Sequence, residues 1–351
     1  MSYSGINRGS TARRAVASPV AKRTPRSAGN RLRYRELELK IAALQKDYAE
    51  LHAELVEAAQ VHRRLCAPRL VRHQNFEIAS ETFAVRHVPG DFFTIEETSS
   101  GVILALADIC GKGLAAGMWT TFLAGLVATH TAASAEPEAI VSGVNRDLCR
   151  MSPVAPLATM FLVKLDPVTG SLDYCSAGHP PALLLRANGR LESLSDGGPL
   201  LGVVSAARFD QGRVQLAAGE VLLICSDGIL ESFNEADQEF GMERLEGELR
   251  SAGSGSADAV LFSVLGAVQD FAAPRPLTDD MTLVIVNHHD VVRLTGRQDL
   301  HDLQIQDKPC EVKLPLWWIA VFRVNPVNDW PGYANKQFAN LDLNERERTI
   351  S

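Results

Sequence analysis

Aspartates stand at the ends of apolar segments at four places along the sequence. Asp91 begins one such segment, Asp108 ends another, Asp227 follows a third, and Asp279-Asp280 precede the last. A carboxylate at the end of a buried strand is costly to desolvate unless another group compensates its charge. Four carboxylates that converge would repel one another, and divalent cations are their natural compensation. Oxygen ligands without His or Cys favour Mg²⁺ or Mn²⁺ over Zn²⁺.

Each of these positions is a weak signal when it is taken singly. An aspartate beside glycine at the end of a strand is more often a turn residue or a helix cap than a metal ligand. Gly111 and Gly113, which follow Asp108, are typical of a tight turn from a strand into a helix. The ordered set of aspartates, and no single one of them, indicates a metal centre.

The segments that must position these aspartates alternate between short apolar runs and longer helical patterns. We expect strands over 76–86, 102–109, 158–165, 171–176, 182–186, 190–194, 221–225 and 281–286, and helices over 114–131, 137–151, 242–250 and 257–271. Turn residues at 166–170 and 188–189 predict hairpins. Because the strands cluster in meanders and the helices in pairs, the pattern predicts an α+β fold.

The first 67 residues divide into two parts. Residues 1–31 are basic, lack acidic residues and predict a disordered tail. Residues 32–67 predict a coiled-coil helix, whose apolar residues recur every three or four positions: Tyr34, Leu37, Ile41, Leu44, Tyr48, Leu51, Leu55 and Ala58. We expect this helix to form a parallel homodimer through residues 34–65. The alternative is a single amphipathic helix lying on its own domain.

Composition narrows the class of protein. The net charge of -7 argues against a general nucleic-acid binder. The six cysteines include no CxxC pair, which is typical of reduced thiols in the cytoplasm. No apolar run approaches the roughly 20 residues that a transmembrane helix needs, and the basic start lacks the apolar part of a signal peptide. We therefore expect a cytoplasmic protein without a transmembrane segment.

Eight motifs, in this order and spacing, resemble the metal-dependent PPM protein phosphatases of bacteria, in the branch of SpoIIE and RsbU-like regulators. They occupy residues 88–93, 107–113, 158–161, 176–181, 198–202, 225–231, 240–241 and 279–283. The resemblance covers residues 70–288 and implies a four-layer α-β-β-α sandwich. It assigns no structure to the C-terminal extension, residues 289–351.

The resemblance also implies a site with two Mn²⁺ or Mg²⁺ ions. Asp91 would bridge the ions or bind one of them, and Asp108 would bind one together with the backbone carbonyl of Ile109. Asp227 and Asp279 would complete the other side, whereas Asp280 would be a ligand or an outer group ranked below Asp279. These aspartates would serve catalysis by holding the ions, between which a water loses a proton and attacks phosphorus.

The implied reaction is hydrolysis of phosphoserine or phosphothreonine on a STAS-type anti-anti-sigma protein in a partner-switching pathway. Two departures from the family pattern leave an alternative open. Pro89 replaces a glycine before Asp91, and Thr94 replaces an aspartate after it. The alternative is a catalytically decayed coiled-coil module that sequesters a sigma-factor regulator. A third interpretation is a metal-dependent phosphohydrolase for small molecules.

Lys112 and His179 also stand inside these motifs. Lys112 either contacts the substrate phosphate or is a surface charge after a glycine turn, and we favour the surface charge. His179 lies between Gly178 and Pro180, where a structural role or a place in the substrate groove is favoured over proton transfer.

Overall fold

A computed structural model describes residues 26–65, 69–73, 75–151, 155–253 and 255–289 of the chain. The side chains of the first helix are described from residue 31 onward. Most of the predicted N-terminal tail, and all but the first residue of the extension at 289–351, lie outside this range.

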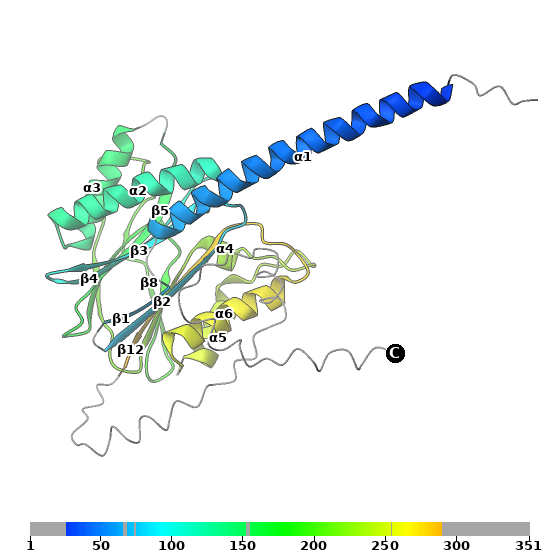
Figure 1. Ribbon diagram of the computed structural model, residues 1–351. Coiled ribbons are helices and arrows are strands. Elements are labelled where there is room, and N and C mark those ends of the chain that lie inside the picture. Colours follow the sequence, from blue (N-terminus) through cyan, green and yellow to red (C-terminus); the bar gives the residue numbers. More distant parts are fainter. Residues whose placement is uncertain (1–25, 66–68, 74, 152–154, 254, 290–351) are drawn as a thin grey trace, which may run out of the picture. The chain divides into compact units, whose positions relative to one another are not determined.

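The chain from residue 70 onward forms two six-stranded sheets (Figure 1). The order of the first sheet is β1 (Leu70–His73), β2 (Phe76–Phe83), β12 (Met281–His288), β11 (Val221–Cys225), β7 (Ala182–Leu185) and β8 (Leu191–Leu194). The second follows β10 (Gly212–Gln215), β6 (Ser171–Ala177), β5 (Ala158–Leu165), β4 (Gly101–Ile109) and β3 (Asp91–Thr98), with β9 (Gly197–Gly198) beside β6. Every neighbouring pair is antiparallel except β6 and β9.

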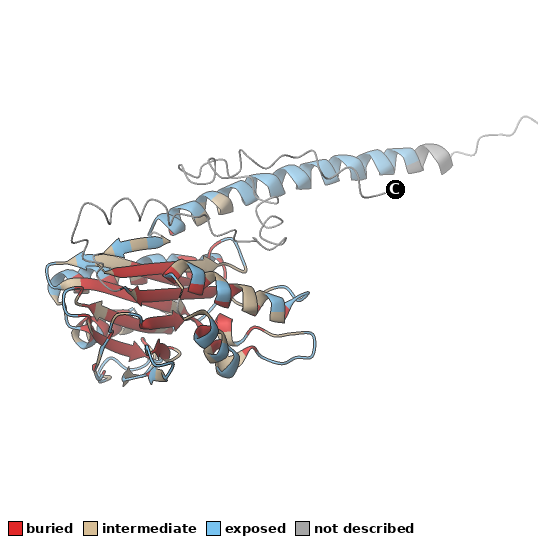
Figure 2. Cartoon of the chain, turned by 90° about the horizontal axis from the view of Figure 1, so that it is seen from below, coloured by how far each residue is buried: buried red, intermediate tan, exposed pale blue. Residues whose placement is uncertain are grey.

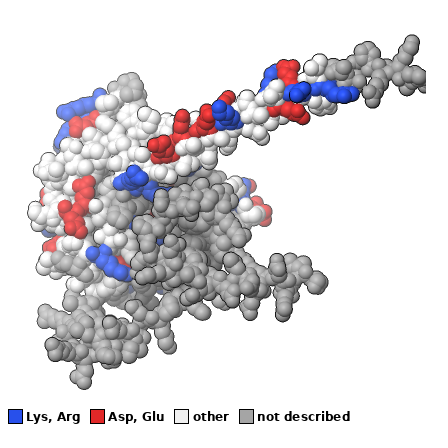
Figure 3. Space-filling model, viewed as in Figure 1, with Lys and Arg blue, Asp and Glu red and all other residues white. Residues whose placement is uncertain are grey.

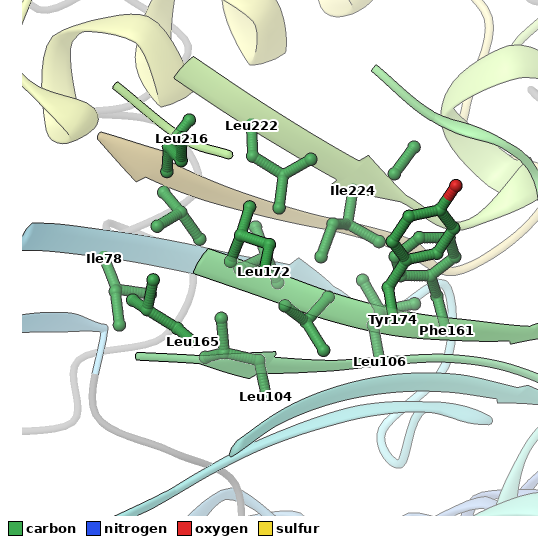
Figure 4. Packing of buried hydrophobic residues seen from close by; sticks show 14 of the residues in the cluster. Ile78, Leu104, Leu106, Phe161, Leu165, Leu172, Tyr174, Leu216, Leu222 and Ile224 are labelled. Atoms are coloured by element: carbon green, nitrogen blue, oxygen red, sulfur yellow. The ribbon is translucent and has the colours of Figure 1, made fainter. Parts of the chain in front are cut away.

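The inner faces of the two sheets share one apolar core (Figure 4). Leu104, Leu106 and Phe161 come from the second sheet, and Leu222 and Ile224 come from the first. Each of these side chains is almost completely buried. Successive side chains of a strand point to opposite faces of the sheet. This core therefore explains why every second residue of each strand is apolar, and the outer faces must explain the others.

Helix pairs cover the outer faces and complete four layers. Helices α2 (Leu114–Ala133) and α3 (Pro137–Arg150) share a core with the second sheet. Helices α5 (Gly241–Ala252) and α6 (Ala257–Ala272) share a core with the first sheet, and the short α4 (Asp227–Leu230) follows β11. Strands buried on both faces read as continuous apolar runs. The predicted four-layer α-β-β-α sandwich is confirmed.

Most predicted boundaries lie within two residues of the observed ones. The predicted hairpins are present as the antiparallel pairs β5–β6 and β7–β8. Strand β2 ends at Phe83 and not at residue 86, because the backbone N–H of Val85 donates to the Asp280 carboxylate and leaves the ladder. Strand β3 is the apolar segment that was expected to begin at Asp91. Strands β1, β9 and β10 have no expected counterpart, and each is four residues long or shorter.

Helix α1 (Arg26–Leu65) confirms the predicted N-terminal helix. It begins inside the range 1–31 that we expected to be disordered. Its apolar stripe is exposed over residues 34–51, as the pale blue of Figure 2 shows. Charged side chains lie along the helix (Figure 3), including the Glu36–Lys40 and Lys46–Glu50 pairs. The homodimeric coil stays a prediction. No helix in the described part of the chain has the length and apolarity needed to cross a membrane.

Candidate metal centre

Asp91 and Asp108 lie directly opposite each other at one end of the second sheet. The β3–β4 register pairs Asp91 with Asp108, and the β4–β5 register pairs Asp108 with Thr159. Side chains in such cross-strand pairs have Cβ atoms about 5 Å apart, and like charges there destabilise the sheet. The register alone therefore brings two of the predicted ligands together.

Asp227 and Asp279 meet at the matching end of the first sheet. The amide of Ser226 donates to the Thr282 carbonyl at 3.0 Å, which holds the start of α4 against β12. A Cβ on Gly228 would overlap the Asp280 carbonyl and lie 3.4 Å from the Cβ of Asp279. Only glycine at position 228 permits this close approach of the Asp227 turn to the Asp279 segment.

Asp280 links the two halves of the site through the backbone. Its Oδ1 accepts the Val85 N–H and its Oδ2 accepts the Gly90 N–H, both at 2.7 Å. Gly90 directly precedes Asp91, and its carbonyl accepts the Ile109 N–H at 3.3 Å. Both Asp280 oxygens accept main-chain N–H groups of the segment that leads to Asp91, so Asp280 positions that segment. The Asp279 oxygens instead accept the N–H of its neighbour Asp280 and the ammonium group of Lys112. Because a lysine side chain moves more easily than the backbone, Asp279 is better suited to be a metal ligand than Asp280.

We predict that Asp280→Asn lowers the affinity for Mn²⁺ about tenfold and destabilises the fold by about 1–3 kcal/mol, because one buried N–H loses its acceptor. The affinity is measured from the Mn²⁺ dependence of turnover, and stability from thermal unfolding. Turnover should recover at saturating Mn²⁺. A loss at saturating Mn²⁺ as deep as that of Asp279→Asn would show instead that Asp280 is itself a ligand.

Burial and the charge of a neighbouring carboxylate raise the pKa values of three of these aspartates. Burial and then the charge of Asp108 raise the pKa of Asp91 well above its usual range. Burial and then the charge of Asp227 raise the pKa of Asp108 to about 7. Burial and then the charge of Asp279 raise the pKa of Asp227. A group of acids that resists ionisation in this way is one that a cation would stabilise.

The residues present fit divalent metal ions with oxygen ligands. The Oδ2 atom of Asp91 is buried and has no hydrogen-bond partner among the described residues. Among those residues, however, no three His, Cys, Asp or Glu side chains are arranged as a ready-made metal cage. Asp91, Asp108, Asp227 and Asp279, with the Ile109 carbonyl, would hold Mn²⁺ or Mg²⁺ once small side-chain movements bring their oxygens together.

Lys112 supplies a positive charge to this acidic cluster. Its Nζ lies 2.6 Å from Asp279 Oδ2 and donates to the Thr278 carbonyl at 2.7 Å. Lys112 is thus an ion-pair partner of a predicted ligand and not simply a surface charge.

His179 lies between the two sheets and is almost completely buried. Its Nδ1 lies 2.7 Å from the hydroxyl of Thr159. Burial lowers the pKa of His179 to about 3, so the imidazole is neutral at physiological pH. This setting fits the structural role that the sequence favoured over proton transfer.

Arg86 is a residue near the site that no sequence motif indicated. The Nη1 atom of its exposed side chain lies 3.2 Å from where a Cβ of Gly113 would sit. Gly113 ends the turn that begins at Asp108, so the guanidinium lies against the rim of the carboxylate cluster. Four residues separate Arg86 from Asp91, and the distance between their side chains depends on how the loop between them folds.

Comparison with known proteins identifies the family. The family model for stage II sporulation protein E (SpoIIE) matches residues 98–289, more than half of the chain. The chain belongs to the SpoIIE family. The phosphoserine phosphatase RsbU of Bacillus subtilis is 21% identical over 240 residues, covering 68% of this chain and 70% of RsbU. The phosphoserine phosphatase RsbP of the same organism is 23% identical over 185 residues, covering 51% of this chain and 45% of RsbP.

Solved structures share the fold. The SiaA-PP2C domain of Pseudomonas aeruginosa superimposes with a TM-score of 0.61 at 20% identity, covering 71% of this chain and all of that domain. The RsbU and RsbW domains of a Mycobacterium tuberculosis protein give 0.56 at 22% identity, covering 64% of this chain and 63% of that one.

Membership in the SpoIIE family confirms the resemblance that the motifs indicated. The protein is a PPM-type protein serine/threonine phosphatase. The matched range begins at residue 98, so Asp91, Pro89 and Thr94 lie outside it. The place of Asp91 in the site rests instead on its register opposite Asp108.

Proposed function

We propose that this phosphatase hydrolyses phosphoserine or phosphothreonine on an anti-anti-sigma protein with a STAS fold, within a partner-switching pathway. The observation that carries the proposal is the meeting of Asp91, Asp108, Asp227 and Asp279 at one end of the sandwich. The relatives RsbU and RsbP are named phosphoserine phosphatases, which supports the reaction class.

The chain's own residues would bind the ions and attract the substrate. Asp91 and Asp108 would hold ions from the second sheet, and Asp227 and Asp279 from the first. When bound, such ions supply an activated water and offset charge on the phosphoryl oxygens. Arg86 lies at the rim of this cluster, where a cation attracts a dianionic phosphate.

The test is hydrolysis of p-nitrophenyl phosphate and of a phosphoserine peptide by the wild type and by Asp227→Asn, with Mn²⁺, Mg²⁺ or EDTA. We expect turnover that requires metal and that falls about a thousandfold in the variant, since the ions provide most of the charge stabilisation. A folded protein that neither turns over substrate nor binds Mn²⁺ would support the decayed binding module. Nucleotides hydrolysed faster than the peptide would support the small-molecule phosphohydrolase.

We propose further that α1 forms a homodimer through residues 34–65 and couples dimerisation to activity. Near its C-terminal end, the buried His62 places Nε2 2.9 Å from the Thr120 hydroxyl of α2. Higher on the helix, His52 Nδ1 lies 3.0 Å from Nε2 of His87, four residues before Asp91. Helix α1 thus contacts both the loop that leads to Asp91 and the helix that follows the Asp108 turn.

A further inference from the structure

An apolar loop, residues 201–204, lies at the same end of the second sheet as the carboxylates. Leu201 is bridged to Ala158, and Ala158 pairs with Ile109 at the end of β4. Two strand spacings of about 4.8 Å therefore place Leu201 about 10 Å from the Asp108 turn. The amide of Cys110, two residues after Asp108, donates to the Leu157 carbonyl at 2.8 Å.

This loop presents apolar side chains to solvent. Val203 and Val204 are 50% and 52% exposed, and Leu157 is 37% exposed. A Cβ on Gly202 would lie 3.5 Å from Leu157 Cδ2, so the valines continue the surface of that leucine. Isolated exposed apolar residues are common and need no explanation. Val168, in the β5–β6 turn at the opposite end of the sheet, is such a residue.

The loop at 201–204 differs from the isolated residue Val168 because buried groups hold the loop in place. Asn145 is completely buried in α3, and its side chain has both a donor and an acceptor bond to the loop. Its Nδ2 donates to the Val204 carbonyl at 2.9 Å, and its Oδ1 accepts the Gly202 N–H at 3.0 Å. Leu201 anchors the loop as a completely buried residue. A fixed loop loses little conformational entropy when a partner binds.

The typical size of a protein–protein interface indicates which kind of substrate would contact the loop. A specific interface buries about 800 Å² on each partner, which corresponds to a disc of roughly 16 Å radius. A folded protein whose phosphate reaches the carboxylates would therefore also cover the loop, whereas a small phosphate ester would not reach it.

We propose that Val203, Val204 and Leu157 form an apolar contact surface that selects a folded phosphoprotein over small phosphate esters. The partner that fits is a protein with an apolar patch beside its phosphoserine or phosphothreonine. This inference rests on the proposed phosphatase function and adds to it the feature of the substrate that the enzyme recognises.

The experiment compares the full chain with the double variants Val203→Asp/Val204→Asp and Val203→Ser/Val204→Ser. The substrates are p-nitrophenyl phosphate and a phosphorylated STAS-domain protein, which is folded. We expect the kcat/KM for the phosphoprotein, relative to that for p-nitrophenyl phosphate, to fall at least about tenfold through a higher KM. The serine variant removes apolar area without adding charge, and Val168→Asp is the matched control that should keep the wild-type ratio.

The outcomes separate this inference from the proposed function. An unchanged ratio in both double variants, with wild-type turnover of p-nitrophenyl phosphate, would overturn the role of the loop and leave the phosphatase intact. A wild type that hydrolyses p-nitrophenyl phosphate but not the phosphorylated STAS-domain protein would overturn both. Equal losses on both substrates would show that the loop supports the fold of the site and not recognition.

Discussion

Replacing Asp91 with asparagine is expected to stabilise the metal-free protein while abolishing its turnover. The side chain of Asp91 is buried opposite Asp108, and its Oδ2 has no hydrogen-bond partner among the described residues. Without a cation, an ionised Asp91 is both desolvated and repelled, which costs stability. Asparagine keeps the shape of the side chain and removes the charge.

The expected gain is on the order of 1–2 kcal/mol in EDTA, or an increase of a few degrees in the unfolding temperature. Turnover of p-nitrophenyl phosphate should fall at least about a thousandfold, because a predicted ligand of the ions has lost its charge. In Mn²⁺ the variant should no longer be more stable than the wild type. The wild type binds the ion and is stabilised by it, whereas the variant binds it poorly.

Thermal unfolding in EDTA and in Mn²⁺, together with turnover, measures both effects. Asp173→Asn is the matched control, since Asp173 is also buried but is paired with Arg213 on β10. That variant should gain no stability in EDTA and should keep its turnover. If Asp91→Asn is less stable than the wild type in EDTA and still active, Asp91 is a structural residue and the metal centre is assigned wrongly.

The fold followed closely from hydrophobic patterning because its strands are apolar and bounded by clear turns. Residues 158–165 and 221–225 were predicted with the boundaries that the structure shows. Strands β1 and β10 lie at the edges of the sheets, and neither has the continuous burial of a central strand. Their sequences are correspondingly mixed, so edge strands of four residues gave no distinct pattern.

The sequence singled out the aspartates that the structure brings together, but not the groups that position them. The ion pair of Lys112 with Asp279 joins residues 167 positions apart in the chain, and so does not arise from local pattern. The same holds for Asp280, whose bond to Val85 stays beside the first sheet and whose bond to Gly90 reaches the segment that enters the second sheet. A motif specifies residue types and their spacing in the chain. The roles of Lys112 and Asp280 depend instead on which ends of the strands lie together in the folded protein.

The largest effect on assembly is expected from Leu44→Glu/Leu51→Glu in α1. Both leucines belong to the predicted coiled-coil stripe, and both are more than half exposed in the single chain. A stripe of this period needs a partner helix to bury it. Two buried glutamates in each helix would weaken a parallel dimer at least about a hundredfold, so we expect monomers at micromolar concentration.

Leu39→Glu is the matched control for this prediction, because Leu39 is 68% exposed on the same helix but lies off the stripe. It should leave the mass in solution, measured by light scattering or sedimentation, unchanged. A double variant that keeps the mass of a dimer would show that the chains meet elsewhere. Wild-type protein that is monomeric would favour the alternative of a single amphipathic helix.

Turnover by the same variants tests whether α1 only tethers two domains. Helix α1 contacts Thr120 of α2 through His62, and His87 near Asp91 through His52, so its position bears on both loops that carry carboxylates. If dimerisation fixes that position, turnover per domain should change on the order of fivefold when the dimer dissociates, a typical coupling between two sites. Equal turnover by the monomeric variant and the dimer would assign α1 a role in assembly alone.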